Sequence, residues 1–146
     1  MNAVVVSLAI LAGIAGSVQV AVMGRFGSRV GTLEALTFAT AVQFVLSMTL
    51  LLAARQGAGS FGEAFGAPKW MWAGGAMGLL VVLTITFAQP RIGATATIGI
   101  LIAGQLVMGA VIDRFGLFGV EQISLGWPRA LGIGLLAAGA ALSLSK

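Results

Sequence analysis

The sequence predicts an all-α integral membrane protein with five transmembrane helices, forming a single domain over residues 1–146. Apolar residues make up 59% of the chain and charged residues 8%, whereas a soluble domain carries about 25% charged residues. The apolar residues form long runs, and a run of about 20 residues crosses the ~30 Å hydrocarbon core of a bilayer as a helix. The few charged residues lie mostly in the short polar segments between these runs.

Five apolar spans can be placed along the chain. They cover about residues 3–23, 32–54, 70–89, 92–112 and 130–144. The glycine- and arginine-rich segment 24–31 is expected to be a turn, and Pro90 is expected to stop the third span, because proline interrupts the helical hydrogen-bond ladder. Trp70, Trp72 and Trp127 lie at predicted span boundaries, where indole prefers the headgroup level. We find no clear internal repeat.

The composition excludes several classes of function. The chain has no cysteine and no histidine, so it lacks thiol metal ligands, the usual imidazole ligand and the usual proton shuttle near neutral pH. We therefore expect no cofactor, no metal site and no enzymatic activity. A net charge of +4 would suggest nucleic acid in a soluble protein, but here Lys and Arg stand mostly singly beside apolar spans and suit lipid headgroups. We expect no nucleic-acid partner.

Positive charges are balanced between the two sides of the five-span arrangement. One side holds Arg55, Lys69, Arg114 and Arg129, and the other holds Arg25, Arg29, Arg91 and Lys146. Because an excess of Lys and Arg in cytoplasmic loops sets orientation, a balanced count gives insertion no strong preference. We expect dual topology, in which oppositely inserted copies form an antiparallel homodimer. A single orientation set by another feature, or a sibling chain of opposite orientation, is the alternative.

A family resemblance rests on residues in the second half of the chain. They are Gln89-Pro90-Arg91-Ile92-Gly93-Ala94, Gly104-Gln105-Leu106 and Ile112-Asp113-Arg114-Phe115-Gly116-Leu117-Phe118-Gly119. These segments resemble the YdcZ-type five-helix bacterial membrane proteins of the drug/metabolite transporter superfamily, and the first half agrees more loosely through Gln19 and the segment 24–27. The resemblance implies half of an inverted-repeat fold in the bacterial inner membrane, completed by a second, antiparallel copy around a solute cavity.

Polar side chains inside the spans are the candidates for a solute site, because they are costly in lipid and face the interior of a helix bundle. The candidate substrate-binding residues are Gln19, Gln43, Gln105, Thr40, Ser47 and Glu34. Thr40, Gln43 and Ser47 follow at i, i+3 and i+7, so they share one helix face. For threonine and serine, contacts between helices are the favoured interpretation. For the glutamines a wet cavity is favoured, because an amide has several hydrogen-bonding groups to satisfy.

Glu34 is the only acidic residue placed well inside a span. It is interpreted either as a cation- or proton-binding carboxylate or as an interfacial acid, favoured by the helix dipole and paired with Arg25 or Arg29. The second interpretation is preferred. At the end of the fourth span, Asp113 is expected to form a local ion pair or cap with Arg114.

The sequence therefore predicts a half-size secondary transporter of small solutes, working as a homodimer with a central cavity and alternating access. The alternatives are a non-transporting scaffold subunit and one half of a heterodimeric transporter. The four-helix, cation-exporting relatives in the superfamily that this chain resembles place a glutamate in their first helix, whereas the first span here has no acidic residue. The resemblance therefore implies a neutral or anionic solute rather than cation/proton exchange. The expected partners are the lipid bilayer, a second or sibling chain and the solute.

Overall fold

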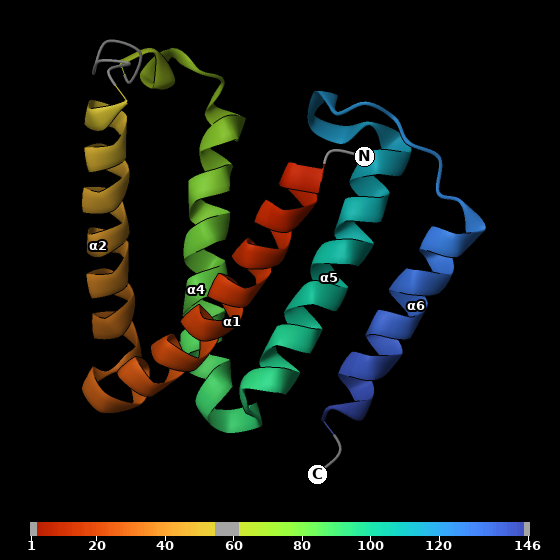
Figure 1. The fold of residues 1–146 in the computed structure, drawn as a ribbon. Coiled ribbons are helices and arrows are strands. Elements are labelled where there is room, and N and C mark those ends of the chain that lie inside the picture. Colours follow the sequence, from red (N-terminus) through yellow and green to blue (C-terminus); the bar gives the residue numbers. More distant parts are fainter. Residues whose placement is uncertain (1–2, 55–61, 145–146) are drawn as a thin grey trace. The chain divides into compact units, whose positions relative to one another are not determined.

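The computed structural model describes residues 3–54 and 62–144 (Figure 1). Over these ranges the regular structure is helical and no strand occurs, which confirms the all-α prediction. The α-helices are α1 (Ala3–Val30), α2 (Thr32–Ala53), α4 (Ala73–Ile92), α5 (Ala94–Phe115) and α6 (Trp127–Leu142). Short 3-10 segments lie at Ala64–Gly66, Lys69–Trp72 and Leu117–Gly119. Arg55 and Lys146, which enter the balance of charges, lie outside the described residues.

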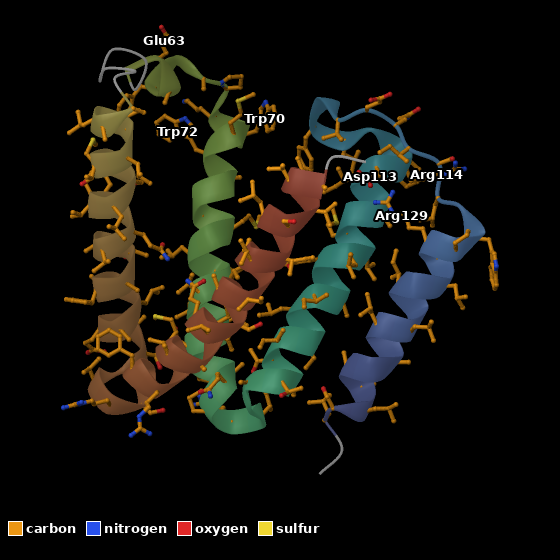
Figure 2. The ribbon with its side chains drawn as sticks, in the orientation of Figure 1. Glu63, Trp70, Trp72, Asp113, Arg114 and Arg129 are labelled. Carbon is orange, nitrogen blue, oxygen red and sulfur yellow. The ribbon has the colours of Figure 1, made fainter. Side chains whose placement is uncertain are left out.

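Four helical segments of the described chain are long and apolar enough to cross a membrane: Ala3–Val30, Thr32–Ala53, Lys69–Ile92 and Ala94–Phe115. The 22 residues of α2 and of α5 each rise about 33 Å, which matches the hydrocarbon core. The last helix, α6, is apolar but has 16 residues and rises about 24 Å. Trp70 and Trp72 lie just before α4 (Figure 2). Trp127 begins α6, and all three indoles are exposed.

The described chain divides into two compact units, which we treat separately. One unit holds residues 22–87, and the other holds residues 1–21 and 88–146. In the latter, α5 and α6 pack against each other. The two helices come close together at Gly99, where a Cβ would lie 3.3 Å from the Cα of Ala140. Small residues at this crossing let the two backbones approach, as in many membrane helix pairs.

The expected turn at residues 24–31 is wrong, because α1 continues to Val30 and only Gly31 leaves the helix. Gly24 is buried, and a Cβ at Gly27 would overlap the Cγ2 atom of Thr86. These glycines therefore allow close packing rather than a turn. The break comes at Gly31, whose φ of 107° suits glycine alone.

Pro90 does not stop the third helix, since α4 continues to Ile92. Near the end of a helix, proline removes only one backbone hydrogen bond, and the ladder closes beyond it through the N–H of Gly93, which donates to the Gln89 carbonyl at 2.9 Å. The helix ends at Gly93, whose φ is 85°. The α4–Gly93–α5 junction therefore has the same construction as the α1–Gly31–α2 junction.

Most large apolar side chains on the long helices are exposed within the described chain. The buried residues of unit 22–87 include Met23, Leu36 and Ile85, which come from three different helices. A soluble monomer rarely exposes contiguous apolar surface on this scale. Lipid or another chain must cover the remaining faces, as the composition already indicated.

Candidate functional site

Glu34 lies in the first turn of α2, and its carboxylate folds back beside Gly31, where a Cβ would overlap the Oε2 atom. No side chain caps this helix N-terminus, so the negative charge lies where the helix dipole favours it. Within the described residues, Glu34 forms no ion pair with Arg25 or Arg29. The interfacial interpretation of Glu34 is therefore supported by its position, without the expected arginine partner.

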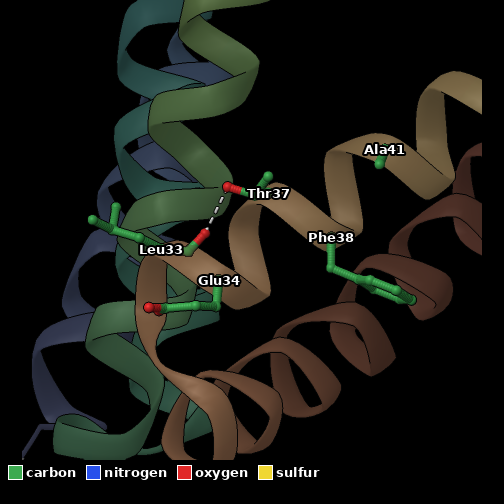
Figure 3. A pocket seen from close by; sticks show the side chains of 5 residues that line it. All are labelled: Leu33, Glu34, Thr37, Phe38 and Ala41. Carbon is green, nitrogen blue, oxygen red and sulfur yellow. Dashed lines mark hydrogen bonds between the residues drawn. The ribbon is translucent and has the colours of Figure 1, made fainter.

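A shallow hollow of about 550 Å³ opens on this part of α2. The residues that line it are Leu33, Glu34, Thr37, Phe38 and Ala41 (Figure 3). The Thr37 hydroxyl donates to the Leu33 carbonyl at 2.8 Å, as the dashed line in Figure 3 shows. The ring of Phe38 meets Phe26 edge to face, with the centroids 5.7 Å apart. This contact packs the start of α2 against the end of α1 and holds the Phe38 side of the hollow in place.

The hydroxyls of the polar stripe are already bonded within α2. Thr40 donates to carbonyls of the preceding turn, at 3.0 Å to Leu36 and 2.9 Å to Thr37. Ser47 donates to the Phe44 carbonyl at 2.9 Å. Each hydroxyl keeps lone pairs that can accept a further hydrogen bond, but its proton is used locally. As donors to a solute, these two side chains are therefore weak candidates.

The glutamine amides differ from the hydroxyls. Gln43 and Gln105 are exposed and Gln19 is half-buried, and none of the three amides forms a hydrogen bond within residues 3–54 and 62–144. Gln43 and Gln105 each lie eleven residues after the first residue of their helix, about 16 Å along a helix of about 33 Å. At this depth in a bilayer, only a water-filled cavity, a solute or another chain can supply hydrogen-bond partners.

The candidate residues do not gather on one surface of α2. Glu34 and Gln43 are nine residues apart, which places them about half a turn of the helix from each other. One side of α2 carries Glu34 and Thr37, and the other carries the Thr40–Gln43–Ser47 stripe. Gln19 and Gln105 belong to the other compact unit, so they are described only within it.

The two junctions reveal an internal correspondence that the sequence analysis missed. Arg29 and Gly31 precede Gln43 with the same spacing with which Arg91 and Gly93 precede Gln105. Both glycines have positive φ, and each glutamine follows its glycine by twelve residues. The matching positions are few and lie among interchangeable apolar residues, which hides the correspondence. Aligning the chain on its single-glycine junctions would have found it.

At the end of α5, Asp113 pairs with Arg129 from the first turn of α6, so the expected pairing with Arg114 is wrong (Figure 2). Consecutive residues on a helix point about 100° apart and do not face each other. The Asp113 carbonyl also accepts a hydrogen bond from the N–H of Ile123 at 2.9 Å. Asp113 therefore fastens the 116–126 connection and α6 to the end of α5, and Arg114 is left outside this ion pair.

Comparisons with known proteins agree with a location in the membrane. The family described as "Putative inner membrane exporter, YdcZ" matches residues 4–142. Inner membrane protein YdcZ of Escherichia coli (strain K12) is 33% identical over 122 residues, which cover 82% of this chain and 80% of that protein. No solved structure matches the chain. The chain therefore belongs to the YdcZ family, whose members are inner-membrane proteins described as exporters.

Proposed function

We propose that the chain is half of a secondary transporter and that two oppositely oriented copies enclose a cavity for a small solute. The observation that carries this proposal is the pair of mid-helix amides, Gln43 and Gln105, which lack hydrogen-bond partners within the described chain. An unpaired amide in an apolar medium costs several kcal/mol, on the order of 4–8 in the driest reference solvent. A hydrated cavity removes that cost and gives the amides a role in binding.

The chemistry of these helices favours a polar solute that is neutral or anionic. The groups near the middle of α2 and α5 are amides and hydroxyls, whereas the carboxylate of Glu34 lies at a helix end. Amides donate and accept hydrogen bonds, so they recognise hydroxyl, amide and carboxylate groups without fixing a charge. The exporter description of the family supports transport out of the cell as the direction.

Two features support the pairing of copies. Large apolar faces remain uncovered within the described chain, and the sequence carries four positive residues on each side of the five-span arrangement. A second copy of opposite orientation would rebuild an inverted-repeat transporter from two chains, and rocking one copy against the other would give alternating access.

The first test of the antiparallel homodimer is a measurement of the membrane orientation of the chain. A reporter that is active in the cytoplasm and one that is active in the periplasm are each fused after Lys146, and both are measured at equal expression. Signal from both reporters is expected, because the balanced charges allow both orientations. Signal from one reporter alone would rule out the antiparallel homodimer and would point to a sibling chain of opposite orientation.

Ligand binding tests the transport function itself. The purified protein is heated in detergent with a panel of neutral and anionic metabolites, and the unfolding temperature is recorded for each. A transported solute stabilises the folded protein by an amount that grows with the ratio of its concentration to its dissociation constant, whereas a scaffold subunit has no small ligand to find. The solute should stabilise the wild type and a Gln122→Leu control in the exposed 116–126 connection, and it should stabilise Gln43→Leu much less.

A further inference from the structure

The packing of α5 against α6 leaves a long apolar groove within one compact unit. Two hollows, of about 320 Å³ and 520 Å³, lie along this helix pair and share Val107 and Val111 in their walls. Alanines of α6, such as Ala137 and Ala141, form the other side of the larger hollow. The two hollows together make one continuous surface, which we call the α5–α6 groove.

A single cationic side chain stands in the wall of the smaller hollow. Arg114, in the last turn of α5, lines it and is exposed. Its neighbour Asp113 is already bound by Arg129, and within the described residues Arg114 has no ion-pair partner. The groove thus ends in a guanidinium group that lacks an anion.

The length of the groove corresponds to one leaflet of a bilayer. Ile100, Val107 and Arg114 follow at i, i+7 and i+14, so they lie in one line along α5 that rises about 21 Å. Half of the hydrocarbon core measures about 15 Å. Trp127 begins α6 at the end that holds Arg114, and an exposed indole marks the headgroup level there. The apolar part of the groove therefore lies at acyl-chain depth and Arg114 at phosphate depth.

We propose that the α5–α6 groove is a phospholipid-binding site, with one acyl chain along the groove and the phosphate on Arg114. A guanidinium binds phosphate through two parallel, charge-assisted hydrogen bonds, and small side chains along the groove leave room for a flexible chain. A membrane phosphate would supply the anion that Arg114 lacks within the described residues. Charge complementarity therefore favours the lipid as occupant.

Bound lipid can be counted directly. Wild-type protein is purified, stripped of lipid with excess detergent and titrated with 1-palmitoyl-2-oleoyl-phosphatidylglycerol, and native mass spectrometry measures the fraction that carries one lipid. In Arg114→Gln the dissociation constant is expected to rise about tenfold or more, because hydrogen bonds to a charged group are lost. Arg25→Gln removes the same charge from the end of α1, in the other compact unit, and should bind as the wild type does.

A second variant tests the apolar part of the site. Ala137→Phe fills the groove without touching Arg114 and is expected to abolish the single-lipid adduct. Ala141→Phe replaces it if the first variant does not fold. Equal lipid binding by wild type and Arg114→Gln would overturn the proposal. So would a disulfide between two copies of an Ala137→Cys variant in native membranes, because the chain has no cysteine of its own and a second copy would then cover the groove.

Discussion

At Gly31 and at Gly93 the chain makes the same turn, yet the helices that follow differ in character. Each glycine has positive φ, and each donates its N–H to a carbonyl four residues earlier, at 3.0 Å and 2.9 Å. After Gly31, α2 carries Glu34 and the polar stripe that ends at Ser47. After Gly93, α5 carries glycines and one mid-helix amide, Gln105, and packs against α6.

This difference shows that the geometry of the turn does not determine the character of the helix that follows it. A single glycine with positive φ ends one helix and begins the next whatever follows it, because only glycine adopts that backbone at low cost. What α2 and α5 share beyond the turn is an amide at the same depth, Gln43 and Gln105. The solute site proposed above would account for an amide at the same position along two otherwise different helices.

The largest expected effect comes from the two turn glycines. Gly31→Ala and Gly93→Ala should each lower the free energy of unfolding by about 1–3 kcal/mol, because alanine is strained at these dihedral angles. At Gly31 the new methyl group would also displace the carboxylate of Glu34, whereas nothing lies within 4 Å at Gly93. Unfolding in mixed micelles titrated with dodecyl sulfate measures both variants.

A double-mutant cycle sharpens this comparison. In a Glu34→Ala background, the cost of Gly31→Ala should fall to that of Gly93→Ala, because the carboxylate that it displaces is gone. An unchanged difference between the two glycines would show that the junctions differ in their backbones, contrary to the equivalence described above.

The two amides give the next effect. Gln43→Leu and Gln105→Leu should each weaken binding of the transported solute about tenfold, since one or two hydrogen bonds to the solute are lost. The folded protein should remain as stable as the wild type, because the amides make no hydrogen bond within the described chain. Isothermal titration with the solute found by thermal screening measures the affinity. If only one variant loses affinity, the two junctions do not contribute equivalent amides.

Two glycines on α5 test the packing role of the second junction. A Cβ at Gly99 would lie 3.3 Å from Ala140, whereas a Cβ at Gly109 would meet no atom within 4 Å. Gly109→Ala should stabilise the protein by up to about 1 kcal/mol through helix propensity. In Gly99→Ala the same gain in helix propensity should be cancelled by the close contact of the new methyl group with Ala140. Unfolding in mixed micelles would measure the difference in free energy of unfolding between the two variants. Equal effects would mean that α5 and α6 are held less closely than the structure shows.

The all-helical fold with long apolar helices was predictable, because hydropathy alone identifies segments long enough to cross a bilayer. The inverted repeat that the family resemblance implies stays a prediction. The helix ends were less predictable. Glycine and proline at 24–31 and at Pro90 suggested turns, but Gly27 is a packing contact with Thr86 and the true breaks are at Gly31 and Gly93. Whether a glycine turns the chain or admits a neighbour depends on tertiary contacts that local sequence does not contain.

The candidate site was predictable in its residue types and less so in its grouping. Scarcity alone singles out the glutamines and Glu34, because few polar groups occur in the spans. Helical periodicity correctly joins Thr40, Gln43 and Ser47, and it also separates Glu34 from them by about a third to a half of a turn. The pairing of Asp113 with Arg129 depends on a connection that folds α6 back to the end of α5, which no local spacing reveals.

The smallest expected effect concerns that ion pair. Asp113→Asn removes the carboxylate that binds Arg129, and both side chains are partly exposed, at 20% and 45%. Pairs of this kind contribute about 0–1 kcal/mol, so the free energy of unfolding should fall by less than about 1 kcal/mol. The freed Arg129 then adds a second cation near Arg114, and lipid binding in the α5–α6 groove should tighten slightly. A loss of lipid binding would instead show that the ion pair holds Arg114 and the end of the α5–α6 groove in place. The second junction would then differ from the first also in the role of the connection that follows its helix.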